Sequence, residues 1–181
     1  MSELFSIQLQ NRQQQGRDGV WLDLPTTTEQ VQAALRQIGI SSDNPQGLFI
    51  SGYFAEEEKR FAIPYNMVLA SNVDELNFLA SRLETLSTGE RAELNAALQA
   101  PQSELFSIGR ITDFPENVDY YVYLPDVHGP AQLGDYYLNR SGMVDMPEEW
   151  KGGIDTAQFG RYVAQQEQGV FTEYGYFVKS G

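Results

Sequence analysis

Carboxylates are the most abundant side chains in this sequence that could carry out acid–base chemistry or bind metals, because it contains 25 Asp and Glu residues, one histidine and no cysteine. The lack of cysteine excludes zinc–thiolate clusters and thiol nucleophiles, and the single His128 excludes imidazole-rich metal sites and most catalytic triads. A glycosidase would need two carboxyl groups that converge on a pocket. The run Glu56-Glu57-Glu58 and the pair Asp113 and Glu116 could supply them, but their pattern favours a solvated acidic loop.

His128 and the known ligand-binding motifs give no further candidate. His128 lies in the turn-rich segment 125–130, where a lone imidazole is expected to be exposed. The calcium-loop pattern, the phosphate-binding loop and the dinucleotide-binding glycine pattern do not occur in the sequence. We therefore expect no enzymatic activity, no cofactor and no metal site.

The charge of the chain is its most prominent property. Acidic residues outnumber basic ones by 25 to 12, which gives a formal net charge of −13. The net charge is −3 over residues 1–60, −3 over 61–100 and −7 over 101–181. Such a chain repels nucleic acids and anionic membranes. Solubility alone could explain the charge, but a dimer would carry the charge of about 44 Å of duplex DNA, at about one charge per 1.7 Å.

The elements that must position these charges begin with a small N-terminal unit. Residues 4–9 and 19–24 alternate in polarity as half-buried strands do. A helix follows, with capping-box spacing between Thr26 and Glu29 and with Gly39 at its expected end. Residues 47–54 supply a third strand. Residues 1–61 are therefore predicted to form a β-β-α-β unit.

The middle of the chain, residues 62–101, is predicted to be helical. One helix is opened by Ser71-Asn72, and a second has capping-box spacing between Ser87 and Glu90 and is stopped by Pro101. The apolar residues of each follow a helical period, and the acidic residues lie on the opposite side.

An internal repeat suggests a second β-β-α-β unit over residues 102–181. The hexapeptide Ser2–Ile7 recurs letter for letter at Ser103–Ile108, and Leu124-Pro125 follows it at nearly the offset of Leu24-Pro25. Gly169–Phe177 resembles the third strand of the first unit with one extra residue, as a β-bulge would give. We infer a duplication with an additional helical segment over residues 146–166. Chance convergence of short strands is the alternative.

Three segments carry a family resemblance: Gly19–Pro25 (Gly-Val-Trp-Leu-Asp-Leu-Pro), Asn77–Leu86 and Ile154–Arg161. Together they resemble the ArdA antirestriction proteins of plasmids and conjugative transposons, over almost the whole chain. The most specific match is the family's antirestriction motif, here carried by Ile154, Asp155, Phe159, Gly160 and Arg161. Phe159 stands where the family commonly has tyrosine.

The resemblance implies an elongated, three-part α+β homodimer that imitates bent DNA and occupies the DNA-binding groove of type I restriction-modification enzymes. Its parts would be residues 1–61, 62–101 and 102–181, with dimerisation through the last. The partner-binding acidic surface would comprise Glu56, Glu57, Glu58, Asp74, Glu75, Glu84, Glu90, Glu93, Asp113, Glu116, Asp119, Asp126, Asp135, Asp145, Glu148, Glu149 and Asp155.

Two other functions remain open at this point. An acidic adaptor could bind a protein through the C-terminal part, which holds 14 of the 22 aromatic residues. A small hydrolase would need a converging pair of carboxylates. In each case we expect a cytoplasmic protein that binds neither nucleic acid nor membranes, because residues 1–12 lack the apolar core of a signal peptide and no run of 18 apolar residues occurs.

Overall fold

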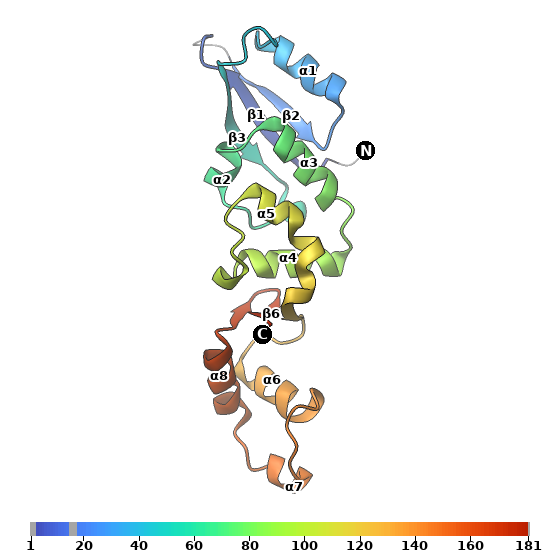
Figure 1. The fold of residues 1–181 in the computed structure, drawn as a ribbon, viewed down its shortest axis with the longest axis vertical. Helices are drawn as coiled ribbons and strands as arrows, with labels where there is room; N and C mark the ends of the chain where they lie inside the picture. The colour runs from blue at the N-terminus through green and yellow to red at the C-terminus, as the bar shows by residue number, and fades with distance from the viewer. Residues whose placement is uncertain (1–2, 15–17, 181) are drawn as a thin grey trace. The chain divides into compact units, whose positions relative to one another are not determined.

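The computed structural model describes residues 3–14 and 18–180, which fold as an α+β protein with two three-stranded antiparallel sheets in that part of the chain (Figure 1). This confirms the predicted fold class. The residues group into two compact units: unit 1 comprises residues 1–87 and 106–113, and unit 2 comprises residues 88–105 and 114–181. The predicted helical middle is thus divided between the units, and three separate subdomains stay a prediction.

Unit 1 contains the N-terminal β-β-α-β arrangement that the sequence predicts. Its sheet has the order β2-β1-β3, and a bulge between Gln8 and Leu9 shifts the register of β1 against β3. Thr27, one residue later than predicted, caps the first helix by accepting a hydrogen bond from the Gln30 N–H at 3.3 Å. Gly39 follows that helix with φ +75°, as predicted. The elements are β1 (Phe5–Asn11), β2 (Val20–Leu24), α1 (Thr28–Gln37) and β3 (Leu48–Phe54).

Helices complete unit 1 and bury one face of its sheet. They are η1 (Glu57–Lys59), α2 (Tyr65–Leu69), α3 (Val73–Leu83) and α5 (Ile108–Asp113). Asn72 caps α3 as predicted, because its side chain accepts a hydrogen bond from the Glu75 N–H at 2.9 Å. Asn77 on α3 binds the Thr26 backbone twice, accepting from its N–H at 2.8 Å and donating to its carbonyl at 3.0 Å. This pair of bonds ties α3 to the segment between β2 and α1.

Unit 2 is built around a central strand that comes last in the chain. Its sheet has the order β4-β6-β5, and four of the five residues of β6 are buried. The core includes Val127, Leu133, Tyr137, Ala164 and Tyr176. The elements are α4 (Thr88–Leu98), η2 (Pro101–Ser103), η3 (Phe114–Tyr120), β4 (Tyr121–Leu124), α6 (Pro130–Asp135), the π-helical η4 (Tyr136–Arg140), α7 (Glu148–Lys151), α8 (Thr156–Glu167), β5 (Val170–Thr172) and β6 (Gly175–Lys179).

The predicted duplication is wrong. Ser103–Ile108, expected as a strand, instead ends a short 3-10 helix, passes through Glu104 at φ +55° and enters α5. The Ser103 hydroxyl donates to the carbonyls of Ala97 and Ala100, at 2.7 and 2.8 Å, which holds this segment in a local turn. Ser2, the first residue of the earlier copy, lies outside the described residues. The two sheets therefore differ in strand order.

The predicted bulged strand over Gly169–Phe177 is also wrong. The segment is a hairpin in which β5 and β6 pair through Thr172 and Gly175, with two residues between them. Gly175 has φ +134°, a conformation that only glycine adopts easily. The additional segment over 146–166 is helical as predicted, but it forms two helices, α7 after Pro147 and α8 after Asp155.

Candidate functional site

The predicted acidic surface lies on the outside of both units. Of its 17 carboxylate residues, 16 are exposed and Glu93 is half-buried. Unit 1 holds 12 acidic and 7 basic residues, a net charge of −5, whereas unit 2 holds 13 acidic and 5 basic residues, a net charge of −8. The role of these residues in binding a partner stays a prediction, and unit 2 has the higher charge density.

In unit 2, Glu93 lies near Glu90 and Asp119, and Tyr123 of β4 lies near Glu93 and Asp126. Glu90 and Glu93 lie on α4, Asp119 lies in η3 and Asp126 follows β4; we call these four the α4–β4 acidic cluster. Partial burial raises the pKa of Glu93, and the negative charges of Glu90 and Asp119 raise it further. Burial likewise raises the pKa of Tyr123, with Glu93 and Asp126 adding to the effect. Like charges are therefore close enough to repel one another here.

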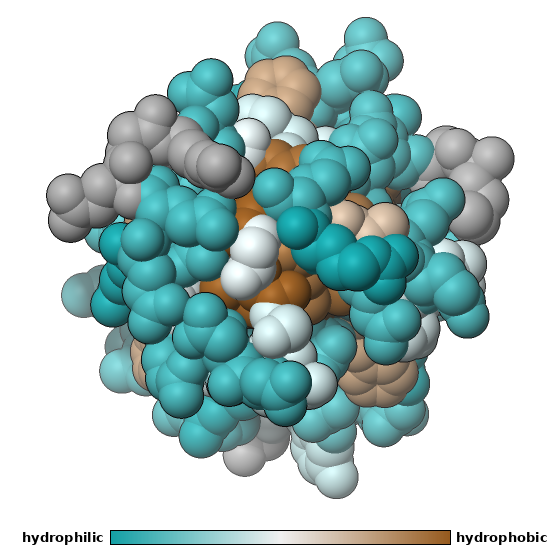
Figure 2. Space-filling view, turned by 90° about the horizontal axis from the view of Figure 1, so that it is seen from above, coloured by the Kyte–Doolittle hydropathy of each residue, from teal (hydrophilic) through white to brown (hydrophobic). Residues whose placement is uncertain are grey.

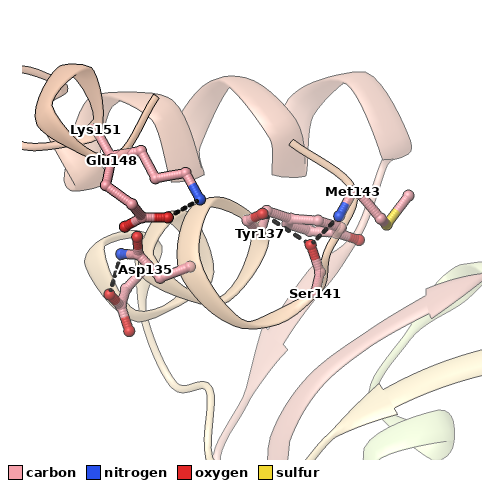
Figure 3. A network of polar contacts seen from close by, with 7 residues as sticks. Asp135, Tyr137, Ser141, Met143, Glu148 and Lys151 are labelled. Carbon is pink, nitrogen blue, oxygen red and sulfur yellow. Dashed lines mark hydrogen bonds and ion pairs between the residues drawn. The ribbon is translucent and has the colours of Figure 1, made fainter. Parts of the chain in front are cut away.

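Some other carboxylates of unit 2 have cationic or polar partners (Figure 3). Asp135 accepts a hydrogen bond from the Asn139 amide at 2.8 Å and lies 3.7 Å from the Arg140 guanidinium. Glu148 on α7 lies 3.1 Å from the Lys151 ammonium. The Asp135–Arg140 pair is exposed on both sides and contributes about 0–1 kcal/mol, whereas the Lys151 side chain is largely covered. These ion pairs fix side-chain positions, and unit 2 still keeps its large negative net charge.

The hydrolase hypothesis needs two carboxylates at one cavity, and Asp126 and Asp135 both line an open cavity of about 420 Å³ together with Arg140. Glu56 lines a cavity of about 10 Å³, which has room for about one water molecule and not for a sugar ring. His128 is exposed, as predicted, and its backbone N–H donates to the Gln132 side chain at 2.6 Å. Among the residues that the structure describes, no group of three or more His, Cys, Asp or Glu side chains is arranged to hold a metal ion.

The motif residues Ile154–Arg161 run from just before the N-cap of α8 into its first turns. The Asp155 carboxylate caps the helix, accepting hydrogen bonds from the N–H groups of Ala157 and Gln158 at 3.0 and 3.1 Å. Phe159 packs against the core of unit 2, and Ile154 is half-buried. Arg161 is exposed. Asp155 thus has a structural role in addition to its place on the acidic surface.

Gly160 allows α8 to pack directly against α6. A Cβ atom at Gly160 would lie 1.7 Å from the Pro130 carbonyl oxygen, and one at Gly134 on α6 would lie 1.9 Å from the Thr156 carbonyl oxygen. The two helices therefore touch backbone to backbone at two points. Sequence reasoning missed Gly134, although a glycine inside a helix costs about 1 kcal/mol relative to alanine and so indicates a packing requirement.

A comparison with known protein families shows to which family the chain belongs. The model of the family described as "Antirestriction protein (ArdA)" matches residues 15–178, which is nearly the whole chain and includes the α8 motif. The chain belongs to the ArdA family. A search of curated proteins found no match to it. In the described part of this family member, no helix is long and apolar enough to cross a membrane.

In this ArdA family member, a second feature that sequence reasoning missed holds the motif helix in place. Glu167, at the end of α8, accepts hydrogen bonds from two tyrosine hydroxyls, Tyr137 at 2.5 Å and Tyr176 at 2.6 Å. Burial raises the pKa of both tyrosines, and the hydrogen bonds to Glu167 raise it further. These two hydrogen bonds, which we call the tyrosine clamp, join α8 to η4 and to the central strand β6.

Proposed function

We propose that the chain is a non-enzymatic inhibitor that occupies the DNA-binding groove of type I restriction-modification enzymes in place of DNA. Membership of an antirestriction family supports the activity class. The exposed carboxylates support the mechanism, because they can bind the Lys and Arg groups that otherwise contact DNA phosphates. The partner is then a protein, and the chain itself binds no nucleic acid.

The α4–β4 acidic cluster is the observation that carries this proposal. Charges needed only for solubility are best dispersed, because close carboxylates repel one another. Here burial raises the pKa of Glu93, and the negative charges of Glu90 and Asp119 nearby raise it further. A cationic groove would relieve this repulsion on binding, as counterions do along a nucleic acid.

The proposal includes a homodimer formed through unit 2. Of the nine large apolar side chains that are exposed among the described residues, four lie in this unit: Tyr120 (64%), Met143 (74%), Trp150 (64%) and Tyr162 (60%). A stable interface covering such residues would bury about 1,200 Å² or more in total. Light scattering at micromolar concentration tests this, and a monomer there would contradict it.

The same exposed residues favour one alternative function, an acidic adaptor that binds a protein partner through apolar contacts. The two functions differ in their response to salt. Carboxylate-to-cation contacts are screened by salt, whereas burial of apolar surface is not weakened by it.

The experiment is a titration of a type I restriction enzyme's DNA binding by this protein at two salt concentrations. We expect displacement of DNA, mutually exclusive binding, and an apparent affinity that falls steeply with added salt. A ternary complex with DNA, or inhibition that is indifferent to salt, would exclude occupation of the groove.

Charge variants sharpen this test. Single changes such as Glu57→Gln or Asp119→Asn should each have little effect, because exposed ion pairs contribute about 0–1 kcal/mol. Neutralising many positions together should abolish inhibition; the set is Glu84, Glu90, Glu93, Asp113, Glu116, Asp119 and Asp135. Asp155 is left unchanged because it caps α8. The matched control exchanges Glu for Asp and Asp for Glu at the same seven positions, which preserves the charge and should preserve inhibition.

A further inference from the structure

Unit 1 contains a cavity that none of the 17 carboxylates lines. It has a volume of about 460 Å³ and lies between α1 and the segment 40–48. Figure 2 looks onto unit 1 from the side that carries α1 and shows apolar side chains surrounded by a hydrophilic rim. Small-molecule sites occupy about 300–1,000 Å³ and are lined mostly by apolar groups. The cavity has the size and lining of such a site.

The apolar lining exists because α1 leaves part of its hydrophobic stripe uncovered. Ala34 is buried, whereas Leu35 on the same stripe is only half-buried. Leu35 faces the cavity together with Ile40, Pro45 and Leu48. Four aliphatic residues therefore offer a surface that a hydrocarbon chain could cover, with a gain of about 25 cal/mol for each Å² removed from water.

The polar part of the cavity lining is positively charged, whereas the chain as a whole has a net negative charge. Arg36, near the end of α1, is exposed, and its guanidinium has no ion pair or hydrogen bond within the described residues. The Ser41 and Ser42 hydroxyls also line the cavity and have no partner in that part of the chain. Asp43 belongs to the same segment but is not one of the lining residues. The charged donor and the two hydroxyls are complementary to an anion.

We propose that this cavity binds a small amphipathic monoanion of the medium-chain carboxylate class. The hydrocarbon chain lies against Leu35, Ile40 and Leu48, and the carboxylate accepts hydrogen bonds from Arg36. This site is independent of restriction-enzyme inhibition, because the acidic surface contributes nothing to it. Binding can therefore be measured on the free protein, whatever the outcome of the inhibition assays.

The test is a titration of the full chain with sodium octanoate, followed by calorimetry and by amide chemical shifts. We expect saturable binding at one site, with the largest shifts in residues 32–36 and 40–48. Octylamine, which has the same chain length and the opposite charge, should bind at least about tenfold more weakly. Equal binding of the two compounds, or shifts centred elsewhere, would overturn the proposal.

Two variants separate the contributions of charge and cavity. Arg36→Gln should weaken octanoate binding about fivefold, the range expected for one exposed ion pair, and should leave binding of uncharged octanol unchanged. Ser42→Trp should fill the entrance and weaken both compounds. Arg82→Gln on α3, outside the cavity, is the control and should change neither affinity. Octanoate binding that is unaffected by Arg36→Gln would contradict the proposed role of the guanidinium.

Discussion

The two units of this protein contain sheets of the same size that are built in opposite chain order. In unit 1 the central strand is β1, the first in the chain, whereas in unit 2 it is β6, the last. In unit 1 the cavity beside α1 is lined mainly by aliphatic residues, whereas in unit 2 the cavity beside α6 is lined by Asp126, Asp135 and Arg140, and α6 and α8 make backbone contact. Unit 2 also has the larger net charge, −8 against −5. The unit with the larger net charge is thus also the one with direct helix-to-helix backbone contacts.

A hexapeptide shared by both halves shows how strongly context decides structure. Phe5 is 4% exposed within a strand that pairs on both sides, whereas Phe106, the same letter in the recurring segment, is 70% exposed and precedes a helix. Strand preference measures the fit to neighbouring strands rather than a property of the backbone alone. Identical letters therefore do not establish a duplicated fold.

The largest expected effect tests whether unit 2 depends on its glycine contacts. Gly160→Ala places a methyl group against the Pro130 carbonyl, a backbone atom that cannot move without separating α6 from α8. Overpacking of this kind costs about 1–3 kcal/mol and sometimes more, and we expect at least about 3 kcal/mol here. Chemical denaturation measures the loss, and amide exchange should show it in unit 2 while unit 1 stays protected.

The control for this prediction is Gly89→Ala in α4. A Cβ atom at Gly89 meets nothing within 4 Å, so alanine should be neutral or stabilise by up to about 1 kcal/mol. If Gly160→Ala were as harmless as Gly89→Ala, the backbone contact would not hold the helices together. Loss of protection in unit 1 as well would mean that the two units unfold as one.

The next effect concerns the tyrosine clamp. Glu167→Ala removes the acceptor of both the Tyr137 and Tyr176 hydroxyls and leaves these two buried side chains without that hydrogen-bond partner. Hydrogen bonds to charged groups contribute about 1.5–3 kcal/mol each, so we expect a loss of about 3 kcal/mol. Glu167→Gln keeps one acceptor oxygen, so its loss should be smaller than that of Glu167→Ala but at least about half of it. A large loss in Glu167→Ala with no loss in Glu167→Gln, which keeps the size of the side chain, would indicate that packing, not hydrogen bonding, explains the effect.

The clamp also predicts a pH dependence. The folded state raises the pKa of both tyrosines above their usual value of about 10, so it retains two protons that the unfolded chain releases. Stability is therefore full below about pH 10 and falls as the pH rises above it. In Glu167→Ala this alkaline slope should be shallower, which thermal denaturation between pH 8 and pH 11 would measure.

The sequence predicts those parts of the protein that depend on near neighbours. The cap at Asn72, the turn at Gly39 and the first three strands follow from local patterns, and the structure confirms them. Contacts between distant positions could not be predicted. Tyr137 and Glu167 are 30 residues apart in the sequence, and the approach of Gly134 to Thr156 requires the crossing of two helices.

The candidate site likewise has features that the sequence predicts and features that depend on contacts between distant residues. Exposure of the carboxylates follows from the cost of burying a charge, so 16 of 17 lie at the surface. Partial burial of Glu93 depends on how α4 meets η3 and β4, which no local pattern encodes. The cavity beside α1 was missed for a related reason. Periodicity identifies the apolar stripe of a helix, but it does not show how much of that stripe the sheet covers.

The smallest expected effect tests whether unit 2 tolerates charge repulsion at a cost to its stability. The raised pKa of Glu93 means that the folded state binds a proton more tightly than the unfolded chain does. The stabilising contribution is therefore complete below the unfolded pKa and is lost as the pH rises through the folded one. Glu93→Gln resembles the protonated form, so it should raise the melting temperature at pH 7 and change it little at pH 4. Glu58→Gln in η1 of unit 1 is the exposed control and should show a smaller difference between the two pH values. A melting temperature lowered at pH 7 by Glu93→Gln would mean that the carboxylate is stabilised by its surroundings, and that the higher charge of unit 2 carries no penalty at this position.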